Sequence, residues 1–136
     1  MQPQPLSLGA KFVAALFAGS SVLHTVRPEV FTGTIPEFLP YPRELVYLSG
    51  AAEMLCAVGL IVPRTRPVAA MAAAALLVAI FPANLQMAWS AGEDLVAKGA
   101  TTGRGLTLGV ALVRLPLQWP LIRWAWGARG AVPGSR

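Results

Sequence analysis

Residues 68–89 read VAAMAAAALLVAIFPANLQMAW and contain no charged side chain. A helix of about 20 apolar residues is long enough to cross the hydrocarbon core of a bilayer. A helix on the surface of a soluble protein would instead carry charged and polar residues along one face, with a period of 3.6. Because this stretch has no charge at all, it predicts a membrane-spanning helix and decides the fold class.

Three more apolar stretches of similar length occur, at residues 8–26, 45–62 and 105–126. The dipeptide Arg27-Pro28 should end the first helix and Pro63 the second, because the residue before a proline avoids the helical conformation. We therefore expect an all-α integral membrane protein, a bundle of four transmembrane helices in which residues 1–136 form a single membrane domain.

The composition agrees with a bilayer as the main partner. Hydrophobic residues make up 55% of the chain and charged residues 12%, about half the charged fraction of a soluble domain. The net charge of +5 would suit nucleic acid in a soluble protein. Here the cations lie at the ends of the apolar stretches, so that membrane topology explains them better, and we expect no nucleic-acid binding.

The loops carry different charges on the two sides of the predicted bundle. The side with both termini and the tight basic turn at residues 63–67 has no acidic residue and six cations: Lys11, Arg64, Arg66, Arg123, Arg129 and Arg136. The other side has four cations, offset by five carboxylates: Arg27, Arg43, Lys98 and Arg104 against Glu29, Glu37, Glu44, Glu93 and Asp94. The positive-inside rule places both termini in the cytoplasm. We expect a multi-pass protein of the bacterial inner membrane, with a long extracytoplasmic loop at residues 27–44.

Two charges remain inside the predicted spans, Glu53 and Arg114. Charges at such positions are costly and usually face the interior of a bundle. Glu53 lies eight residues after Leu45, and Arg114 lies nine after Gly105, on two helices that run in the same direction. The two charges should therefore have nearly equal depth, and we expect a direct ion pair between them. The pair could lock two helices together, form part of a polar site at mid-membrane, or do both.

Other polar side chains lie near these charges or near the outer interface. Gln118 shares a helix face with Arg114. His24, Asn84 and Gln86 lie toward the outer ends of their helices and could form a cluster beneath the first loop, or could face the lipid headgroups. Pro82 lacks an amide hydrogen and should free the carbonyl of Val78. Six side chains could therefore bind a ligand at an intramembrane polar site: Glu53, Arg114, Asn84, Gln118, His24 and Gln86.

The sequence excludes several kinds of chemistry. The single histidine rules out a bis-histidine haem, and the single cysteine, Cys56, cannot run a dithiol relay. No phosphate-binding glycine loop or nucleophile elbow is present. We expect no metal site and see no complete catalytic constellation, so that enzymatic activity stays open.

Four motifs together carry a family resemblance: LVYLSGAAE at residues 45–53, VPRTR at 62–66, FPANLQMA at 81–88 and RLPLQ at 114–118. In this order and spacing, over roughly residues 22–126, they resemble the DoxX-like family of small bacterial membrane proteins. The resemblance implies a four-helix membrane bundle with Glu53, Asn84, Arg114 and Gln118 at the family's characteristic polar positions. The family takes its name from a subunit of thiosulfate:quinone oxidoreductase, which implies contact with a quinone.

Some relatives of that family differ from this chain. The fold is similar to that of quinone-linked disulfide-forming enzymes, but their paired cysteines are absent here, which argues against thiol oxidation. Other relatives look like membrane partners of oxidative-stress enzymes.

Three functions remain open. The first is a non-catalytic or accessory subunit of a membrane redox or stress-response system, with a protein partner or a second copy of the chain. The second is a quinone-binding membrane subunit of an oxidoreductase. The third, a small-molecule transporter, is weaker because four helices without repeats would need to oligomerise to enclose a path.

Overall fold

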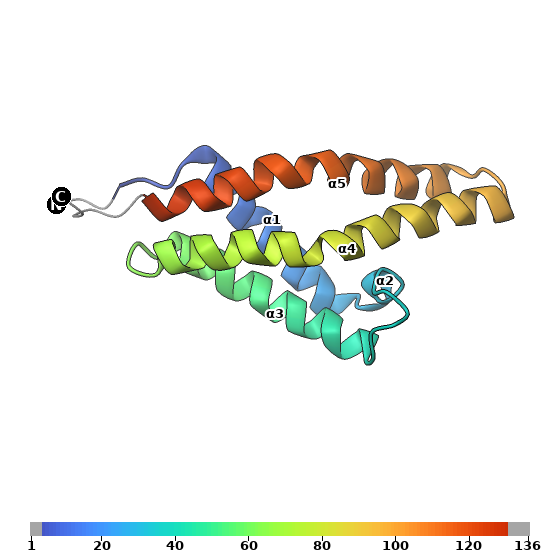
Figure 1. Ribbon diagram of the computed structural model, residues 1–136, viewed down its shortest axis with the longest axis horizontal. Helices are drawn as coiled ribbons and strands as arrows, with labels where there is room; N and C mark the ends of the chain where they lie inside the picture. Colours follow the sequence, from blue (N-terminus) through green and yellow to red (C-terminus); the bar gives the residue numbers. More distant parts are fainter. Residues whose placement is uncertain (1–3, 131–136) are drawn as a thin grey trace.

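The computed structural model describes residues 4–130, and every regular element among them is helical. Arg136, one of the cations used to orient the chain, lies outside the described residues. In chain order the elements are α1 (Leu8–Val26), α2 (Glu29–Thr32), α3 (Pro42–Ile61), α4 (Arg66–Lys98), α5 (Thr102–Gly127) and a 3-10 turn, η1 (Ala128–Gly130) (Figure 1). Four of these helices, α1, α3, α4 and α5, are long and apolar enough to cross a membrane.

Local sequence signals explain where the helices begin. The Ser7 hydroxyl caps α1 by accepting a hydrogen bond from the backbone N–H of Ala10 at 3.2 Å. The Thr101 hydroxyl caps α5 in the same way, from the N–H of Arg104. A proline stands in the first turn of α3 and of α4, where its missing N–H costs no intrahelical hydrogen bond.

The third long helix is longer than the sequence indicated. We expected it to end at Trp89 and a polar loop to follow at residues 90–104, but α4 continues to Lys98 and only residues 99–101 separate it from α5. The added turns are supported by a salt bridge between Asp94 and Lys98, one helical turn apart, at 2.7 Å. Gly99, with φ of +81°, ends the helix. The expected loop was wrong because polarity alone does not prevent a helix.

The first loop also contains more helix than expected. Residues 27–44 hold the short helix α2, and α3 begins at Pro42 instead of Leu45. The fourth long helix likewise begins three residues before the expected position 105.

The four long helices form a ring in which each packs against two others. α4 packs against α3 and α5, and α1 packs against α3 and α5. Figure 1 shows α4 and α5 side by side along the long axis, with α1 and α3 inclined to them and α2 near the ends of α1 and α3. Helices α3 and α5, which carry Glu53 and Arg114, are therefore diagonal to one another in this ring.

Small side chains let α3 and α4 pack closely at the centre of the bundle. The alanine-rich start of α4 buries Ala69, Ala70, Ala73 and Ala74, as expected for close helix packing. A Cβ added to Gly59 on α3 would lie only 2.6 Å from the Ala69 Cβ. The two helices can approach this closely because neither carries a large side chain at the contact.

One cation of the basic turn is buried. Arg66 is 4% exposed, and its guanidinium donates to the carbonyl oxygens of Leu60, Ile61 and Gln4 at 2.9, 3.3 and 2.8 Å. The first two carbonyls belong to the end of α3, where helix carbonyls lack intrahelical donors. Arg66 therefore closes α3 and holds the segment before α1 against it. The sequence indicated only its charge and not this role.

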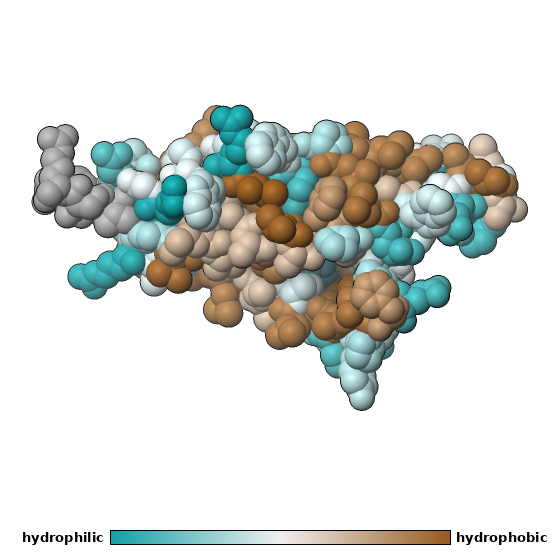
Figure 2. Space-filling view, in the orientation of Figure 1, coloured by the Kyte–Doolittle hydropathy of each residue, from teal (hydrophilic) through white to brown (hydrophobic). Residues whose placement is uncertain are grey.

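The outer surface of the bundle is apolar. At most a third of the most apolar 18-residue window of each long helix is buried, and the value for α5 is 17%. Large apolar side chains such as Leu55, Val68 and Trp119 are two-thirds exposed or more. Figure 2 shows hydrophobic residues over much of the visible face. Contiguous apolar surface on this scale is typical of membrane or protein contact.

Candidate functional site

The carboxylate of Glu53 on α3 lies beside the imidazole of His24 on α1. Glu53 Oε2 is 3.3 Å from His24 Nδ1, and both side chains are more than nine-tenths buried. The backbone of α3 makes this approach possible at Gly50, one turn before Glu53. A Cβ added to Gly50 would lie 2.7 Å from the Cβ of His24.

The His24–Glu53 contact is close but not aligned as a hydrogen bond. Neither His24 Nδ1 nor Glu53 Oε2 has a hydrogen-bond partner among residues 4–130. The ring of His24 also packs edge-on against Phe31 of α2, with ring centroids 4.0 Å apart. Buried polar atoms are nearly always hydrogen-bonded, so that an unpartnered carboxylate oxygen at this depth calls for an explanation.

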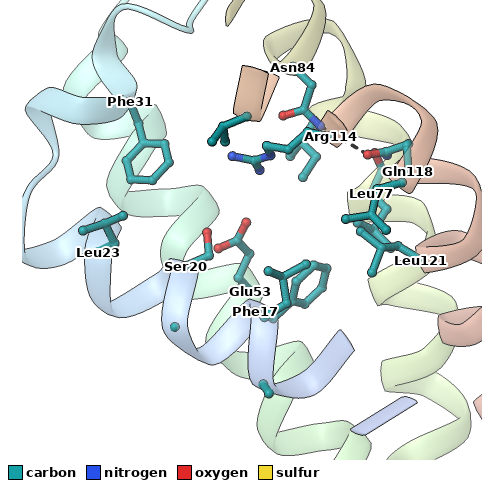
Figure 3. Close-up of a pocket in the computed structure, with 16 residues that line it drawn as sticks. Phe17, Ser20, Leu23, Phe31, Glu53, Leu77, Asn84, Arg114, Gln118 and Leu121 are labelled. Atoms are coloured by element: carbon teal, nitrogen blue, oxygen red, sulfur yellow. Dashed lines mark hydrogen bonds between the residues drawn. The ribbon is translucent and has the colours of Figure 1, made fainter. Parts of the chain in front are cut away.

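The expected direct ion pair between Glu53 and Arg114 is not formed. The salt bridge of Glu53 is with His24, and no hydrogen bond or salt bridge joins Arg114 to any described residue. The reason is the helix order, because α3 and α5 are diagonal and a cavity lies between them. Figure 3 shows the Glu53 carboxylate and the Arg114 guanidinium pointing toward one another into this cavity.

Two buried amides link α4 to α5. The Asn84 side-chain amide donates to Gln118 Oε1 at 3.2 Å, and the Gln118 amide in turn donates to the backbone carbonyl of Leu77 (Figure 3). Leu77 lies in the turn before Pro82, where the proline disturbs the helical hydrogen bonds. We had expected the Val78 carbonyl to be freed, and the carbonyl that takes the side-chain donor lies one residue earlier.

Of the two arrangements left open for His24, Asn84 and Gln86, a cluster beneath the first loop is formed only in part. His24 and Asn84 line the same cavity without touching through a hydrogen bond. Gln86 lines neither cavity of this site, and its amide donates instead to the hydroxyl of Ser90 on the same helix at 3.1 Å. Two residues along a helix correspond to a rotation of about 200°, so that Asn84 and Gln86 cannot face the same cavity.

Two cavities meet at these polar residues. The first, of about 440 Å³, lies between α1, α4 and α5, and the second, of about 540 Å³, lies between α3, α4 and the segment that follows α2. Both volumes lie in the range of small-molecule sites. We call the residues that line both cavities the junction: Phe31, Glu53, Ile80, Asn84 and Arg114.

The walls away from the junction are mostly apolar. Phe17, Leu77 and Leu121 line the first cavity, and Leu39 and Leu48 line the second. A few polar groups in an apolar cavity can hold the head of a lipophilic molecule while its tail lies along the walls. No group of three or more His, Cys, Asp or Glu side chains within residues 4–130 is placed to hold a metal ion.

Sequence reasoning missed most of the lining residues, among them Phe31 and Ser20. Phe31 stands on α2, inside a segment that we read as a loop, and Ser20 of α1 lines the first cavity. The pair Pro28-Glu29 was an available signal for Phe31, because proline and an acidic residue are favoured at the start of a helix.

Comparisons with curated proteins and with solved structures found no match to this chain. A comparison with protein families matched residues 13–129, a range that contains every residue of the junction. The chain therefore belongs to the family described as "Domain of unknown function (DUF8561)".

Proposed function

We propose that the chain is an integral protein of the bacterial inner membrane, with α1, α3, α4 and α5 as its transmembrane helices. The exposed apolar surface supports this proposal, because the helices are apolar on the faces that the bundle does not cover. The distribution of cations supports a cytoplasmic location for both termini and for the turn between α3 and α4. The DoxX-like resemblance of the four motifs fits the same arrangement.

We further propose that the protein is a non-catalytic accessory subunit that holds a quinone-like lipophile in the two cavities. The observation that carries this proposal is the junction, where Glu53, Asn84 and Arg114 face a cavity whose other walls are mostly apolar. A quinone has carbonyl oxygens that can accept hydrogen bonds from Arg114 and an apolar tail that suits the cavity walls. No nucleophile paired with a base accompanies these residues, which favours binding over catalysis.

The test is the analysis of the molecules that purify with the protein. The protein is extracted in mild detergent, transferred to lipid nanodiscs, and its organic extract is examined by mass spectrometry. We expect a near-stoichiometric lipophile of the quinone class, which Arg114→Leu should reduce and Gln86→Ala should leave unchanged, because Gln86 lies outside both cavities. Extracts that match those of empty nanodiscs would contradict the proposal.

A second candidate is an interaction subunit that docks through α5. This helix is the least covered of the four, and a Cβ added to Gly105 or Gly109 would meet nothing within 4 Å. Small residues spaced by four let another helix approach closely in a membrane. This function predicts that Gly109→Leu abolishes a stable protein complex while it leaves the bound lipophile unchanged.

A further inference from the structure

The junction presents one unpartnered acceptor and one unpartnered donor to the cavity. Glu53 is 3% exposed. Its Oε2 lies 3.3 Å from His24 Nδ1 but without hydrogen-bond alignment, so that this oxygen has no hydrogen-bond partner among the described residues. A carboxylate only accepts hydrogen bonds, and a guanidinium only donates them. Arg114, on the opposite wall, has no acceptor among residues 4–130. A bound head group must therefore offer a donor to Glu53 and an acceptor to Arg114.

The side-chain amide of Asn84 also needs a hydrogen-bond donor from the ligand. The side-chain nitrogen of Asn84 already donates to Gln118, and no described residue donates to its oxygen, Oδ1. The relay through Gln118 to the Leu77 carbonyl fixes this assignment, because the Gln118 nitrogen is needed for that carbonyl. The free atom of Asn84 is thus a second acceptor.

The charges of the junction favour a neutral head group. Glu53 contributes one negative charge and Arg114 one positive charge, and the other three junction residues are uncharged. An anionic head would be attracted by Arg114 but repelled by Glu53, and a cationic head would meet the reverse, in a medium where such interactions are poorly screened. The two charges together therefore favour a head without net charge. A neutral head with both a donor and an acceptor avoids both penalties.

From these three observations we infer that the site takes a neutral lipophile whose head carries a hydroxyl donor beside an oxygen acceptor. The inference rests on the proposed ligand-binding function and specifies the ligand's chemistry. Within the quinone class it selects the hydroquinone, whose hydroxyl groups donate to Glu53 and Asn84 while an oxygen accepts from Arg114. The quinone itself has only acceptors and leaves Glu53 Oε2 buried without a hydrogen-bond donor, which is costly.

The experiment compares ligands that differ only in their hydrogen-bond donors. Purified protein, freed of bound lipophile in detergent, is titrated calorimetrically under anaerobic conditions with a decyl-substituted benzoquinone, its hydroquinone and the dimethyl ether of that hydroquinone. We expect the hydroquinone to bind about tenfold more tightly than either of the others, since a hydrogen bond to a charged group typically accounts for such a factor. The ether, which has no redox chemistry, separates the effect of the donor from that of the oxidation state.

The outcomes separate this inference from the proposed function. Equal or tighter binding of the quinone, or of the ether, would overturn the inference and leave a lipophile site in place. The failure of all three to bind would overturn both.

Two matched variants test whether Glu53 is the acceptor for the ligand's hydroxyl group. Glu53→Gln removes the charge-assisted acceptor and adds a donor, so that the preference for hydroquinone should fall toward one. Glu44→Gln makes the same change on the exposed start of α3 and should keep the tenfold preference. Retention of the preference in Glu53→Gln would overturn the inference. If that variant does not fold, the ligand comparison with the unaltered chain still decides the matter.

Discussion

Gly50 on α3 and His24 on α1 lie so close that a Cβ on Gly50 would stand 2.7 Å from the Cβ of His24 and 3.2 Å from its Nδ1. The second of these atoms is the one that faces Glu53. The close approach of the α3 backbone to the His24 side chain thus sets the position of the imidazole relative to the carboxylate.

Replacement of Gly50 by alanine should force α1 and α3 apart. We expect a loss of about 1–3 kcal/mol of stability, as is typical of overpacking, together with weaker ligand binding because His24 moves relative to Glu53. Thermal denaturation in a fixed detergent, followed by circular dichroism, measures the first effect. Gly92→Ala is the control, because a Cβ there meets nothing within 4 Å. Equal stability of the two variants would contradict the close approach.

Arg66 should contribute more to stability than its neighbour Arg64. Arg66→Ala leaves the Leu60 and Gln4 carbonyls without their donor, and hydrogen bonds from a charged group contribute about 1.5–3 kcal/mol. Arg64 is exposed, so that Arg64→Ala should change the unfolding temperature little. A comparison of the two melting curves tests this directly, and similar curves would show that the buried guanidinium is dispensable.

Loss of the Gln118 side chain should destabilise the contact between α4 and α5. Gln118→Leu leaves the Asn84 nitrogen without its acceptor and removes the side-chain donor to the Leu77 carbonyl. A buried polar group left without a partner costs about 1–3 kcal/mol. Gln86→Ala serves as the matched amide control, since it removes only a bond within α4. Hydrogen exchange of the α4 amides near Leu77 should rise in the first variant and not in the second.

Two double-mutant cycles compare the coupling energy of Glu53 with His24 and that of Glu53 with Arg114. In the ligand-free protein, Glu53→Gln and Arg114→Gln should couple more weakly than His24→Ala and Glu53→Gln, because no salt bridge or hydrogen bond joins Glu53 to Arg114. His24→Ala and Glu53→Gln should instead show a coupling of about 1 kcal/mol. A strong coupling between Glu53 and Arg114 without ligand would mean that they pair directly after all.

The sequence predicted the long helices well because hydrocarbon-length apolar stretches are a strong signal. Residues 8–26 match α1 at both ends, where Ser7 and Arg27-Pro28 supply local signals. The end of α4 was missed because its last turns, from Ser90 to Lys98, contain polar side chains although they are helical. Composition does not distinguish such a turn from a polar loop.

Five of the six polar side chains singled out from the sequence line the two cavities, whereas Gln86 does not, and the pairing of these side chains was not predicted. Charge and depth pointed to Glu53 and Arg114 and say nothing of which helices are neighbours. The ring order sets α3 beside α1 and not beside α5, so that the partner of Glu53 is His24. The burial of Arg66 could not be predicted either, because its partners are backbone carbonyls, which every sequence offers equally.

The length of α4 has a further consequence for a protein in a bilayer. Its 33 residues extend for about 50 Å, whereas a bilayer with its headgroups is about 40–45 Å thick. If the start of α4 lies at the inner headgroups, its last turns and the connection to α5 would stand above the outer leaflet as a short stalk. A water-soluble protease that cleaves after basic residues, added to the outside of intact spheroplasts, would then reach Lys98 and Arg104 and would separate α5 from α4.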